Sequence, residues 1–202
     1  MFLPPLTGDP RCSSQRRAGP ALSSSSGRHC QQEPTVPTWG KVRAMSQTIL
    51  ITGASSGIGA GLARAYARRG DRLALIARRL DLLEALATEL RGLGAEVTVH
   101  QGDVTRDGDV LRVVEDLAAQ GIGIDVVYAN AGFGVAGNVQ RLSIADYQRQ
   151  FDTNVFGVLR TVKETVPALR KSRGRLVLVG SVAGHAASAG MSAYSMSKFA
   201  VR

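Results

Sequence analysis

The sequence predicts an α/β fold in which helices cover both faces of a parallel β-sheet, and three observations support this prediction. From Thr48 onward, short apolar runs alternate with segments whose apolar residues recur at helical spacing. The apolar runs are rich in Ile, Leu and Val, which is typical of strands buried on both faces. A glycine-rich segment at 52–59 stands between the first apolar run and the first helical segment, as it does in many nucleotide-binding turns.

We expect five strands, each a short apolar run between turn-forming residues. They are Thr48–Thr52, Arg72–Ala77, Glu96–His100, Asp125–Asn130 and Arg175–Val179. Helices are expected between them because apolar side chains three or four residues apart share one helical face. The residues that define these faces are Ile58, Leu62, Ala65 and Tyr66; Leu83, Leu86 and Leu90; Val110, Val113, Val114 and Leu117; and Val155, Val158, Leu159, Val162 and Val166.

Two local signals refine the helices in the second half of the chain. Ser143 and Asp146 have the spacing of a capping box, which predicts a short helix beginning after Ser143. Pro167 lacks a backbone N–H and lies late in the longest helical segment, so we expect a kink or an early end there.

Length and composition indicate one soluble domain. With 202 residues and 44% apolar residues, the chain can bury a substantial core. It contains no apolar run of roughly 20 residues that could cross a membrane. Residues 1–44 hold most of the prolines and lack regular periodicity, so we expect a disordered or non-native extension before a single domain at 45–202. We therefore expect a cytoplasmic location without membrane association.

The basic charge does not by itself indicate a nucleic-acid-binding protein. The formal net charge is +9, but basic and acidic side chains are interleaved along the helical segments, and only 5% of the residues are aromatic. Solvated helix faces and attraction for an anionic cofactor explain this pattern better than a nucleic-acid groove does. Both cysteines, Cys12 and Cys30, precede the predicted domain, so we expect neither thiol chemistry nor a metal site there.

Glycines at positions 53, 57 and 59 form the pattern G-x-x-x-G-x-G between the first strand and the first helix. Glycine permits a tight turn and a close approach of the backbone to a pyrophosphate, and the helix N-terminus that follows presents free N–H groups. The pattern favours a dinucleotide-binding turn, although a strand-to-helix turn without a ligand also fits the glycines alone.

Tyr194 and Lys198 are one helical turn apart, so their side chains share a helix face. Hydride transfer to a carbonyl leaves negative charge on its oxygen, which then needs a proton donor and a hydrogen-bond partner. Tyr194 can be the donor, and a nearby ammonium group favours the phenolate form of a tyrosine. Ser181 follows the last predicted strand. Taken alone, the Tyr/Lys pair also fits a surface helix, and Ser181 also fits a turn hydroxyl.

In order and spacing, these motifs resemble the short-chain dehydrogenases/reductases. The matching residues are Thr52-Gly-Ala-Ser-Ser-Gly-Ile-Gly59, Asn130-Ala-Gly132, Asn154, Ser181, Tyr194 and Lys198. The resemblance runs from about Thr48 to Arg202 and implies a doubly wound, Rossmann-type parallel sheet of about six or seven strands. Five strands are predicted here, so we expect the last strands of that fold to be missing from this chain.

The resemblance implies a catalytic set and a cofactor-binding set. The cofactor-binding residues are Thr52, Gly53, Ser55, Ser56, Gly57, Ile58, Gly59, Asp103, Val104, Asn130, Ala131, Gly132, Tyr194 and Lys198. In the catalytic set, Tyr194 is the acid/base and Lys198 also holds the nicotinamide ribose. Ser181 binds the reacting oxygen, and Asn154 anchors a water in the proton relay. Asp103 would accept a hydrogen bond from the adenine amine, and a turn aspartate that caps the next helix is an equal interpretation.

The end of the second predicted strand distinguishes between the two nicotinamide cofactors. Folds of this type that prefer NAD commonly place an acidic residue there, which accepts hydrogen bonds from the ribose hydroxyls. This chain has Arg78 and Arg79 instead, and a guanidinium can bind the 2′-phosphate of NADP through charge-assisted hydrogen bonds. We favour NADP(H) over NAD(H), with Arg78 as the first candidate and Arg79 as the second. Alternatively, both arginines simply begin a solvated helix.

The sequence thus predicts an NADP(H)-dependent oxidoreductase that interconverts a ketone or aldehyde with an alcohol. The alternative is a dinucleotide-binding protein without catalytic activity, or an inactive fragment. The resemblance also implies a homodimer or homotetramer that pairs through the helices bearing Asn154 and Tyr194. The substrate itself is not predicted, because in this family the segments that close over it follow the strands that we expect to be missing.

Overall fold

The computed structural model describes residues 46–202, and the expectation for residues 1–44 lies outside this range. Five parallel strands form one sheet in the order β3-β2-β1-β4-β5. The strands are β1 (Thr48–Thr52), β2 (Arg72–Ala77), β3 (Val97–Gln101), β4 (Val126–Ala129) and β5 (Arg175–Leu178). This strand order is that of a doubly wound fold, so the predicted fold class is confirmed.

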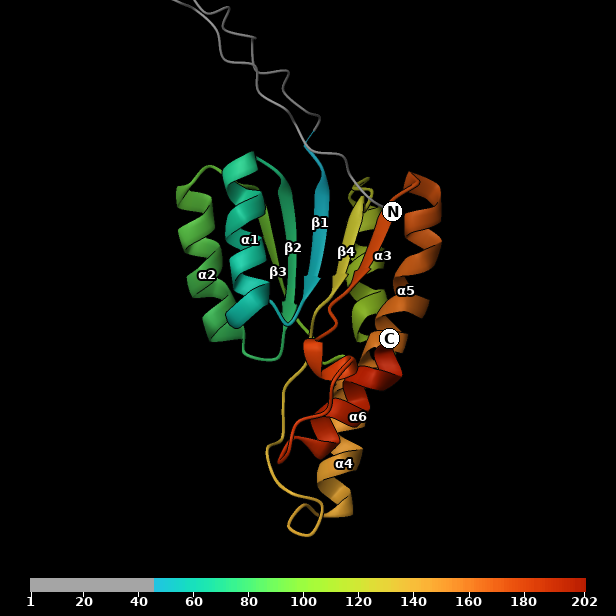
Figure 1. Ribbon diagram of the computed structural model, residues 1–202. Helices are drawn as coiled ribbons and strands as arrows, with labels where there is room; N and C mark the ends of the chain where they lie inside the picture. The colour runs from blue at the N-terminus through green and yellow to red at the C-terminus, as the bar shows by residue number, and fades with distance from the viewer. Residues whose placement is uncertain (1–45) are drawn as a thin grey trace, which may run out of the picture. The chain divides into compact units, whose positions relative to one another are not determined.

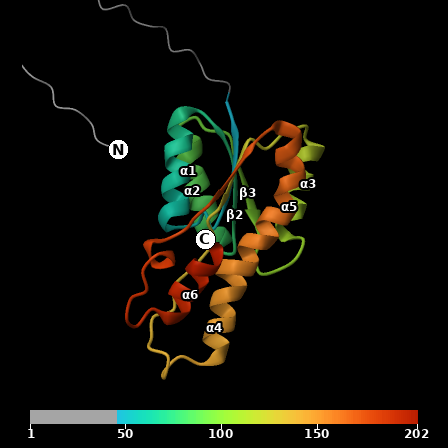
Figure 2. The ribbon, with the colours of Figure 1, turned by 45° about the vertical axis from the view of Figure 1, so that its right-hand side comes forward.

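Helices cover both faces of the sheet (Figures 1 and 2). They are α1 (Gly57–Arg69), α2 (Leu80–Gly92), α3 (Asp109–Ala119), α4 (Ile144–Phe151), α5 (Gly157–Ser172) and α6 (Ser192–Val201). Side chains alternate between the two faces of a strand. Ile49 and Ile51 of β1 therefore pack with α1 and α2, whereas Leu50 packs with α3 and α5. Among the described residues, no helix is long and apolar enough to span a membrane.

The remaining elements lie beyond the carboxyl ends of the strands (Figure 1). There α4 continues through a π-helical turn, η1 (Asp152–Phe156), directly into α5. The predicted capping box begins α4, because the Ser143 hydroxyl accepts a hydrogen bond from the Asp146 N–H and the Asp146 carboxylate accepts one from the Ser143 N–H. A short 3₁₀ turn, η2 (Val182–Gly184), joins β5 to the segment before α6.

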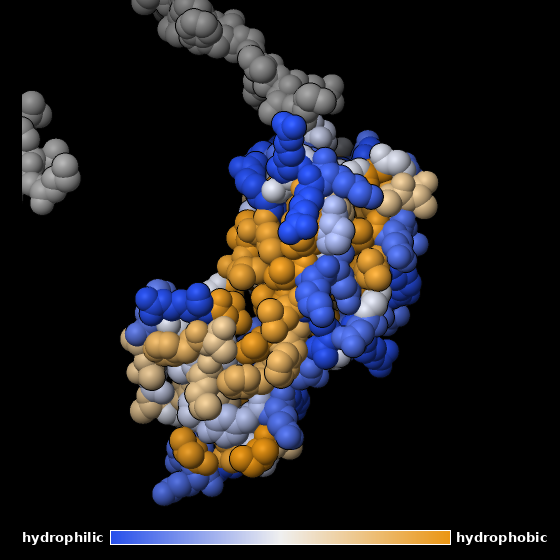
Figure 3. Space-filling model, turned by 90° about the vertical axis from the view of Figure 1, so that its right-hand side faces the viewer, coloured by the Kyte–Doolittle hydropathy of each residue, from blue (hydrophilic) through white to orange (hydrophobic). Residues whose placement is uncertain are grey.

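Burial of the strands is less uniform than we expected. β1 is buried along its whole length, whereas both ends of β5 are exposed, and Leu178 is 42% exposed. Within the described residues, β5 pairs only with β4, so its other edge has no neighbouring strand. Figure 3 shows apolar side chains gathered on this side of the protein. The prediction of burial on both faces therefore holds for β1 and is wrong for β5.

Of the face predicted for the first helix, Leu62 and Tyr66 pack against the core, whereas Ile58 and Ala65 are exposed. Ile58 is 65% exposed, whereas Ala60, Ala63 and Ala67 are buried against the sheet. The reason is the close approach of α1 to the sheet, which only small side chains permit. At Gly59, for example, an added Cβ would lie 2.5 Å from the Gly53 carbonyl oxygen.

The longest helix does not end early at Pro167, because α5 continues to Ser172. Tertiary contacts hold its last turns beyond the proline. The Leu169 side chain is buried, and the Ser172 hydroxyl donates a hydrogen bond of 2.5 Å to the Ile124 carbonyl before β4. These contacts offset the backbone hydrogen bond that Pro167 cannot make.

Candidate active site and dinucleotide cradle

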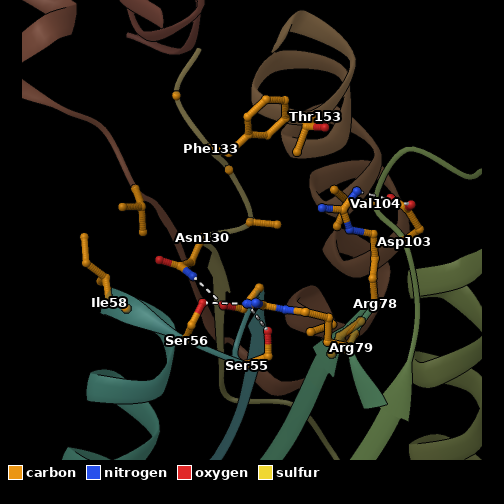
Figure 4. A pocket seen from close by; sticks show the side chains of 18 of the residues that line it. Ser55, Ser56, Ile58, Arg78, Arg79, Asp103, Val104, Asn130, Phe133 and Thr153 are labelled. Carbon is orange, nitrogen blue, oxygen red and sulfur yellow. Dashed lines mark hydrogen bonds and ion pairs between the residues drawn. The ribbon is translucent and has the colours of Figure 1, made fainter. Parts of the chain in front are cut away.

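A cavity of about 720 Å³ lies at the carboxyl ends of the parallel strands, where doubly wound folds bind their ligands (Figure 4). Most residues of the predicted cofactor-binding set line it. They are Gly53, Ser55, Ser56, Gly57, Ile58, Arg78, Arg79, Asp103, Val104, Asn130, Ala131, Gly132, Tyr194 and Lys198. Thr52, Gly59, Asn154 and Ser181 do not line the cavity, and their neighbours explain how each one relates to it.

The glycine turn between β1 and α1 is held against the end of β4. The Thr52 hydroxyl donates to the Tyr128 carbonyl and accepts from the backbone N–H groups of Asn130 and Ala131, at 3.1–3.2 Å. Gly53 has φ +66°, and a Cβ there would lie 2.7 Å from the Ala131 Cα. Thr52 is therefore a support of the turn rather than part of the cavity wall.

The amide of Asn130 closes this turn from the side of β4. Its Nδ2 donates to the carbonyl oxygens of Thr52, at 2.9 Å, and Gly53, at 3.3 Å. Gly59 lies directly behind, because a Cβ at that position would also lie 2.7 Å from the Asn130 Nδ2. The glycine turn is thus packed tightly against Asn130 and Ala131, which follow β4.

The two arginines that follow β2 point to different neighbours (Figure 4). Arg79 extends across the glycine turn, and its Nη2 donates to the hydroxyls of Ser55, at 3.1 Å, and Ser56, at 2.8 Å. Arg78 instead approaches the Asp103 carboxylate, with an N–O distance of 4.0 Å. Arg79 is therefore the guanidinium that lies against the turn.

Asp103 makes a local turn, but it is not the helix cap that one of the two interpretations expected. One carboxylate oxygen accepts hydrogen bonds from the N–H and the hydroxyl of Thr105, which is an Asx-type turn. The residue does not cap α3, since Gly108 occupies that N-cap position. Asp103 and Val104 nevertheless line the cavity, and the second carboxylate oxygen of Asp103 is the one that Arg78 approaches at 4.0 Å.

Tyr194 and Lys198 lie on α6 at the same cavity. The Lys198 Nζ is 5.9 Å from the centroid of the Tyr194 ring and donates a hydrogen bond of 2.8 Å to the Val179 carbonyl after β5. Only 8% of Lys198 is exposed, and this burial lowers the pKa of its ammonium group from the ordinary value. The two side chains therefore lie near each other on one helix, as their one-turn spacing predicts, and line the same cavity as the glycine turn.

Asn154 lies in the π-helical turn η1 behind the cavity wall and is fully buried. Its Nδ2 donates to the Ser197 hydroxyl, at 3.1 Å, and to the Phe133 carbonyl, at 2.9 Å. Ser197 in turn donates to the Tyr194 carbonyl at 2.7 Å. Asn154 thus connects η1 with the helix that carries Tyr194. Irregular turns of this kind within helices are frequent at functional sites.

Ser181 begins the η2 turn, directly after the cavity-lining residues Val179 and Gly180. Its hydroxyl oxygen accepts a hydrogen bond from the Ala183 N–H, which leaves the hydroxyl hydrogen free to be donated. Gly184 packs η2 tightly onto α6, because a Cβ there would lie 2.6 Å from the Lys198 carbonyl oxygen. Ser181 is thereby held on the side of the cavity that Lys198 occupies.

Several cavity residues were not predicted from the sequence. Phe133, Gly134, Thr153 and Met191 also line the cavity, and the Arg149 guanidinium lies 5.6 Å from the centroid of the Phe133 ring. None of these residues belongs to a motif that indicates catalysis or cofactor binding. The sequence offered one signal, since residues 133–134 directly follow the Asn130-Ala-Gly132 segment.

Comparison with known proteins agrees with this geometry. Residues 47–202 match the sequence profile of the short chain dehydrogenase family, and the chain belongs to this family. It is 42% identical over 153 residues to a protein from Myxococcus xanthus described as an uncharacterized oxidoreductase, covering 75% of this chain and 60% of that protein. The chain spans about half the length of several other curated relatives.

Two solved structures show the same fold with bound cofactors. An alcohol dehydrogenase from the archaeon Thermococcus sibiricus, complexed with 5-hydroxy-NADP, superposes with a TM-score of 0.74 at 34% identity, over 77% of this chain and 67% of that one. An NAD⁺-bound xylitol dehydrogenase also superposes with a TM-score of 0.74, at 30% identity, over 77% of this chain and 60% of that one. Structures of this family therefore hold either nicotinamide cofactor in the same fold.

Proposed function

We propose that this protein is an NADP(H)-dependent oxidoreductase that interconverts a ketone or aldehyde with an alcohol. The observation that carries the proposal is a single cavity lined both by the glycine turn and by Tyr194 with Lys198. The turn fits a dinucleotide because Gly53 and Gly59 bring backbone close to backbone, and the N-terminus of α1 presents N–H groups to a pyrophosphate.

The proposed reaction divides between the cofactor and three side chains. The reduced nicotinamide, when bound, supplies a hydride to the carbonyl carbon. Tyr194 gives its phenolic proton to the carbonyl oxygen, so that the carbonyl becomes an alcohol. The Ser181 hydroxyl donates a hydrogen bond to the same oxygen as negative charge develops. The Lys198 ammonium stabilises the phenolate that remains on Tyr194, and the oxidation of an alcohol reverses these steps.

The preference for NADP(H) rests on the two arginines after β2. Arg79 lies against Ser55 and Ser56 of the turn, and together these groups offer donors to a 2′-phosphate. No acidic residue follows β2 directly, although Asp103 beside Arg78 keeps one carboxylate at the cavity. Dissociation constants for NADPH and NADH, measured by titration calorimetry on the same protein, test the preference. Tighter binding of NADH would refute it.

The enzymatic assignment is tested by turnover. Purified protein is incubated with NADPH and a panel of ketones and aldehydes, and oxidation of the cofactor is followed by its absorbance, with the Tyr194→Phe variant as the control. Turnover that depends on Tyr194 supports the proposal. Tight binding of NADPH without turnover of any panel member would instead support the alternative of a non-catalytic dinucleotide-binding protein.

We also propose that the active form is a homodimer or homotetramer that pairs through the helices bearing Asn154 and Tyr194. Large apolar side chains are exposed on these segments, including Phe156 and Leu159, each 51% exposed, and Met196, 53% exposed. Sedimentation analysis of the wild type and a Leu159→Lys variant tests this proposal, since a wild-type monomer would refute it.

A cytoplasmic location remains our expectation, which cell fractionation would check.

A further inference from the structure

Gln150, near the end of α4, is a fully buried polar residue, and the proposed reaction assigns it no role. Both ends of its amide are bonded to one short segment. Its Nε2 donates to the Phe133 carbonyl at 2.5 Å, and its Oε1 accepts from the Val135 N–H at 2.7 Å. Burying an amide costs free energy unless its N–H and C=O groups both form hydrogen bonds. The bonds to Phe133 and Val135 meet this requirement for Gln150.

Asn154 holds the same segment from the next helical turn. Because Gln150 and Asn154 are four residues apart, their side chains share one face of the continuous α4–η1 helix. Asn154 donates to the Phe133 carbonyl and accepts from the Phe133 N–H at 3.1 Å. The Phe133 carbonyl therefore receives two amide donors, and the backbone from Phe133 to Val135 has little freedom to shift.

The segment held in this way forms the wall next to the catalytic tyrosine. Phe133 and Gly134 both line the cavity, whereas Gln150 does not. A Cβ at Gly134 would lie 3.4 Å from the Tyr194 Cδ2 and 3.7 Å from the Met191 Cε, so this backbone lies beside the ring, with room for at most one methyl group between them. Figure 4 shows the Phe133 ring across the cavity from Ser55 and Ser56.

We propose that Gln150 is a positioning residue, which fixes the Phe133–Val135 backbone against the ring of Tyr194 and so sets the geometry of proton transfer. This inference rests on the proposed oxidoreductase function. Because Gln150 contacts the segment beside Tyr194 and makes no hydrogen bond to the glycine turn, its removal should lower kcat by a larger factor than it raises the KM for NADPH. Small misplacements of reacting groups can cost up to about 10²-fold in rate, and we expect a loss of about tenfold in Gln150→Leu.

A matched series separates positioning from general stability. Gln148→Leu, at an exposed site on the same helix, is the control for Gln150→Leu. Gln150→Glu is the decisive variant. A protonated glutamic acid can donate to the Phe133 carbonyl and accept from the Val135 N–H, whereas a carboxylate can only accept and repels that carbonyl. Burial raises the pKa of a carboxyl group, so the introduced glutamic acid should ionise closer to neutral pH than an exposed one does.

We therefore expect the ratio of Gln150→Glu to wild-type kcat to be high at low pH and to fall as the carboxyl group ionises. A ratio independent of pH, or turnover by Gln150→Leu equal to that of Gln148→Leu, would overturn the inference. Because ionisation of a buried carboxyl group also destabilises the fold, the free energy of unfolding of Gln150→Glu is measured by urea denaturation at each pH, and a kcat ratio that only follows the folded fraction would also overturn the inference.

Failure of the proposed function would be visible separately, as absence of wild-type turnover with every carbonyl compound. In that case NMR spectroscopy decides the positioning role without catalysis. The ring signals of Tyr194 should shift in Gln150→Leu and remain unchanged in Gln148→Leu. Unchanged Tyr194 signals in both variants would refute the inference even if the Val135 amide exchanges faster.

Discussion

The glycine turn and the helix α6, which carries Tyr194 and Lys198, line the same cavity, yet different interactions position them. The turn is set by backbone packing, with Gly53 and Gly59 so close to their neighbours that no side chain fits. The helix α6 is held by side-chain hydrogen bonds to segments that are distant in the sequence, such as the bond from Asn154 to Ser197. Close packing therefore requires glycines in the turn, which Thr52 and Asn130 hold against the end of β4, whereas the position of α6 depends on side-chain hydrogen bonds to other elements.

The first prediction separates the two regions most strongly. In Tyr194→Phe, loss of the phenolic proton should lower kcat by about 10²- to 10⁴-fold, the usual contribution of a positioned acid/base. Binding of NADPH, measured by calorimetry, should persist because the glycine turn is unchanged. Turnover close to that of the wild type would show that another group supplies the proton.

The second prediction perturbs the turn instead. Gly59→Ala places a Cβ 2.5 Å from the Gly53 carbonyl oxygen, and overpacking of this kind costs about 1–3 kcal/mol of the free energy of unfolding. NADPH binding should weaken along with stability. Gly61→Ala is the control, because its Cβ meets nothing within 4 Å and should stabilise α1 by about 0.5–1 kcal/mol. Equal urea denaturation curves for both variants would contradict the close-packing argument.

The third prediction concerns the boundary between the turn and β2. In Arg79→Ala, loss of a charge-assisted donor should raise the dissociation constant of NADPH by about tenfold or more. The dissociation constant of NADH should change little, since it has no 2′-phosphate. Arg78→Ala should have the smaller effect, because Arg78 lies beside Asp103 rather than on the turn. Equal effects on both cofactors would remove the basis for the NADP preference.

The fourth and smallest effect concerns Tyr128 of β4, which bonds to Tyr66 of α1 through their hydroxyls at 2.5 Å. Burial, together with the hydrogen bond from Tyr66, raises the pKa of Tyr128 to about 12. A phenol of raised pKa stabilises the fold below its ordinary value of about 10, and that stability is lost as pH rises toward about 12. The free energy of unfolding should therefore fall less steeply over this range in Tyr128→Phe. An identical pH dependence in both proteins would contradict the shift.

Motif spacing anticipated much of the site. Gly53, Arg79, Asn130, Tyr194 and Lys198 line one cavity as their motifs predicted, because each follows a strand or lies on a helix at the same edge of the sheet. Spacing could not reveal Gln150, whose role depends on hydrogen bonds to a loop preceding its helix. Nor could it show that the first arginine after β2 turns toward Asp103 while the second covers the turn.

What the sequence determined by itself was the order of strands and helices, the glycine turn and the Tyr194/Lys198 pair. These features depend on local periodicity and on residues a few positions apart, so they can be inferred without the fold. Tertiary structure alone decided that Ile58 is exposed, that β5 is an open edge within the described residues, and that α5 continues past Pro167. Each of these follows from what an element packs against, and its own residues do not carry that information.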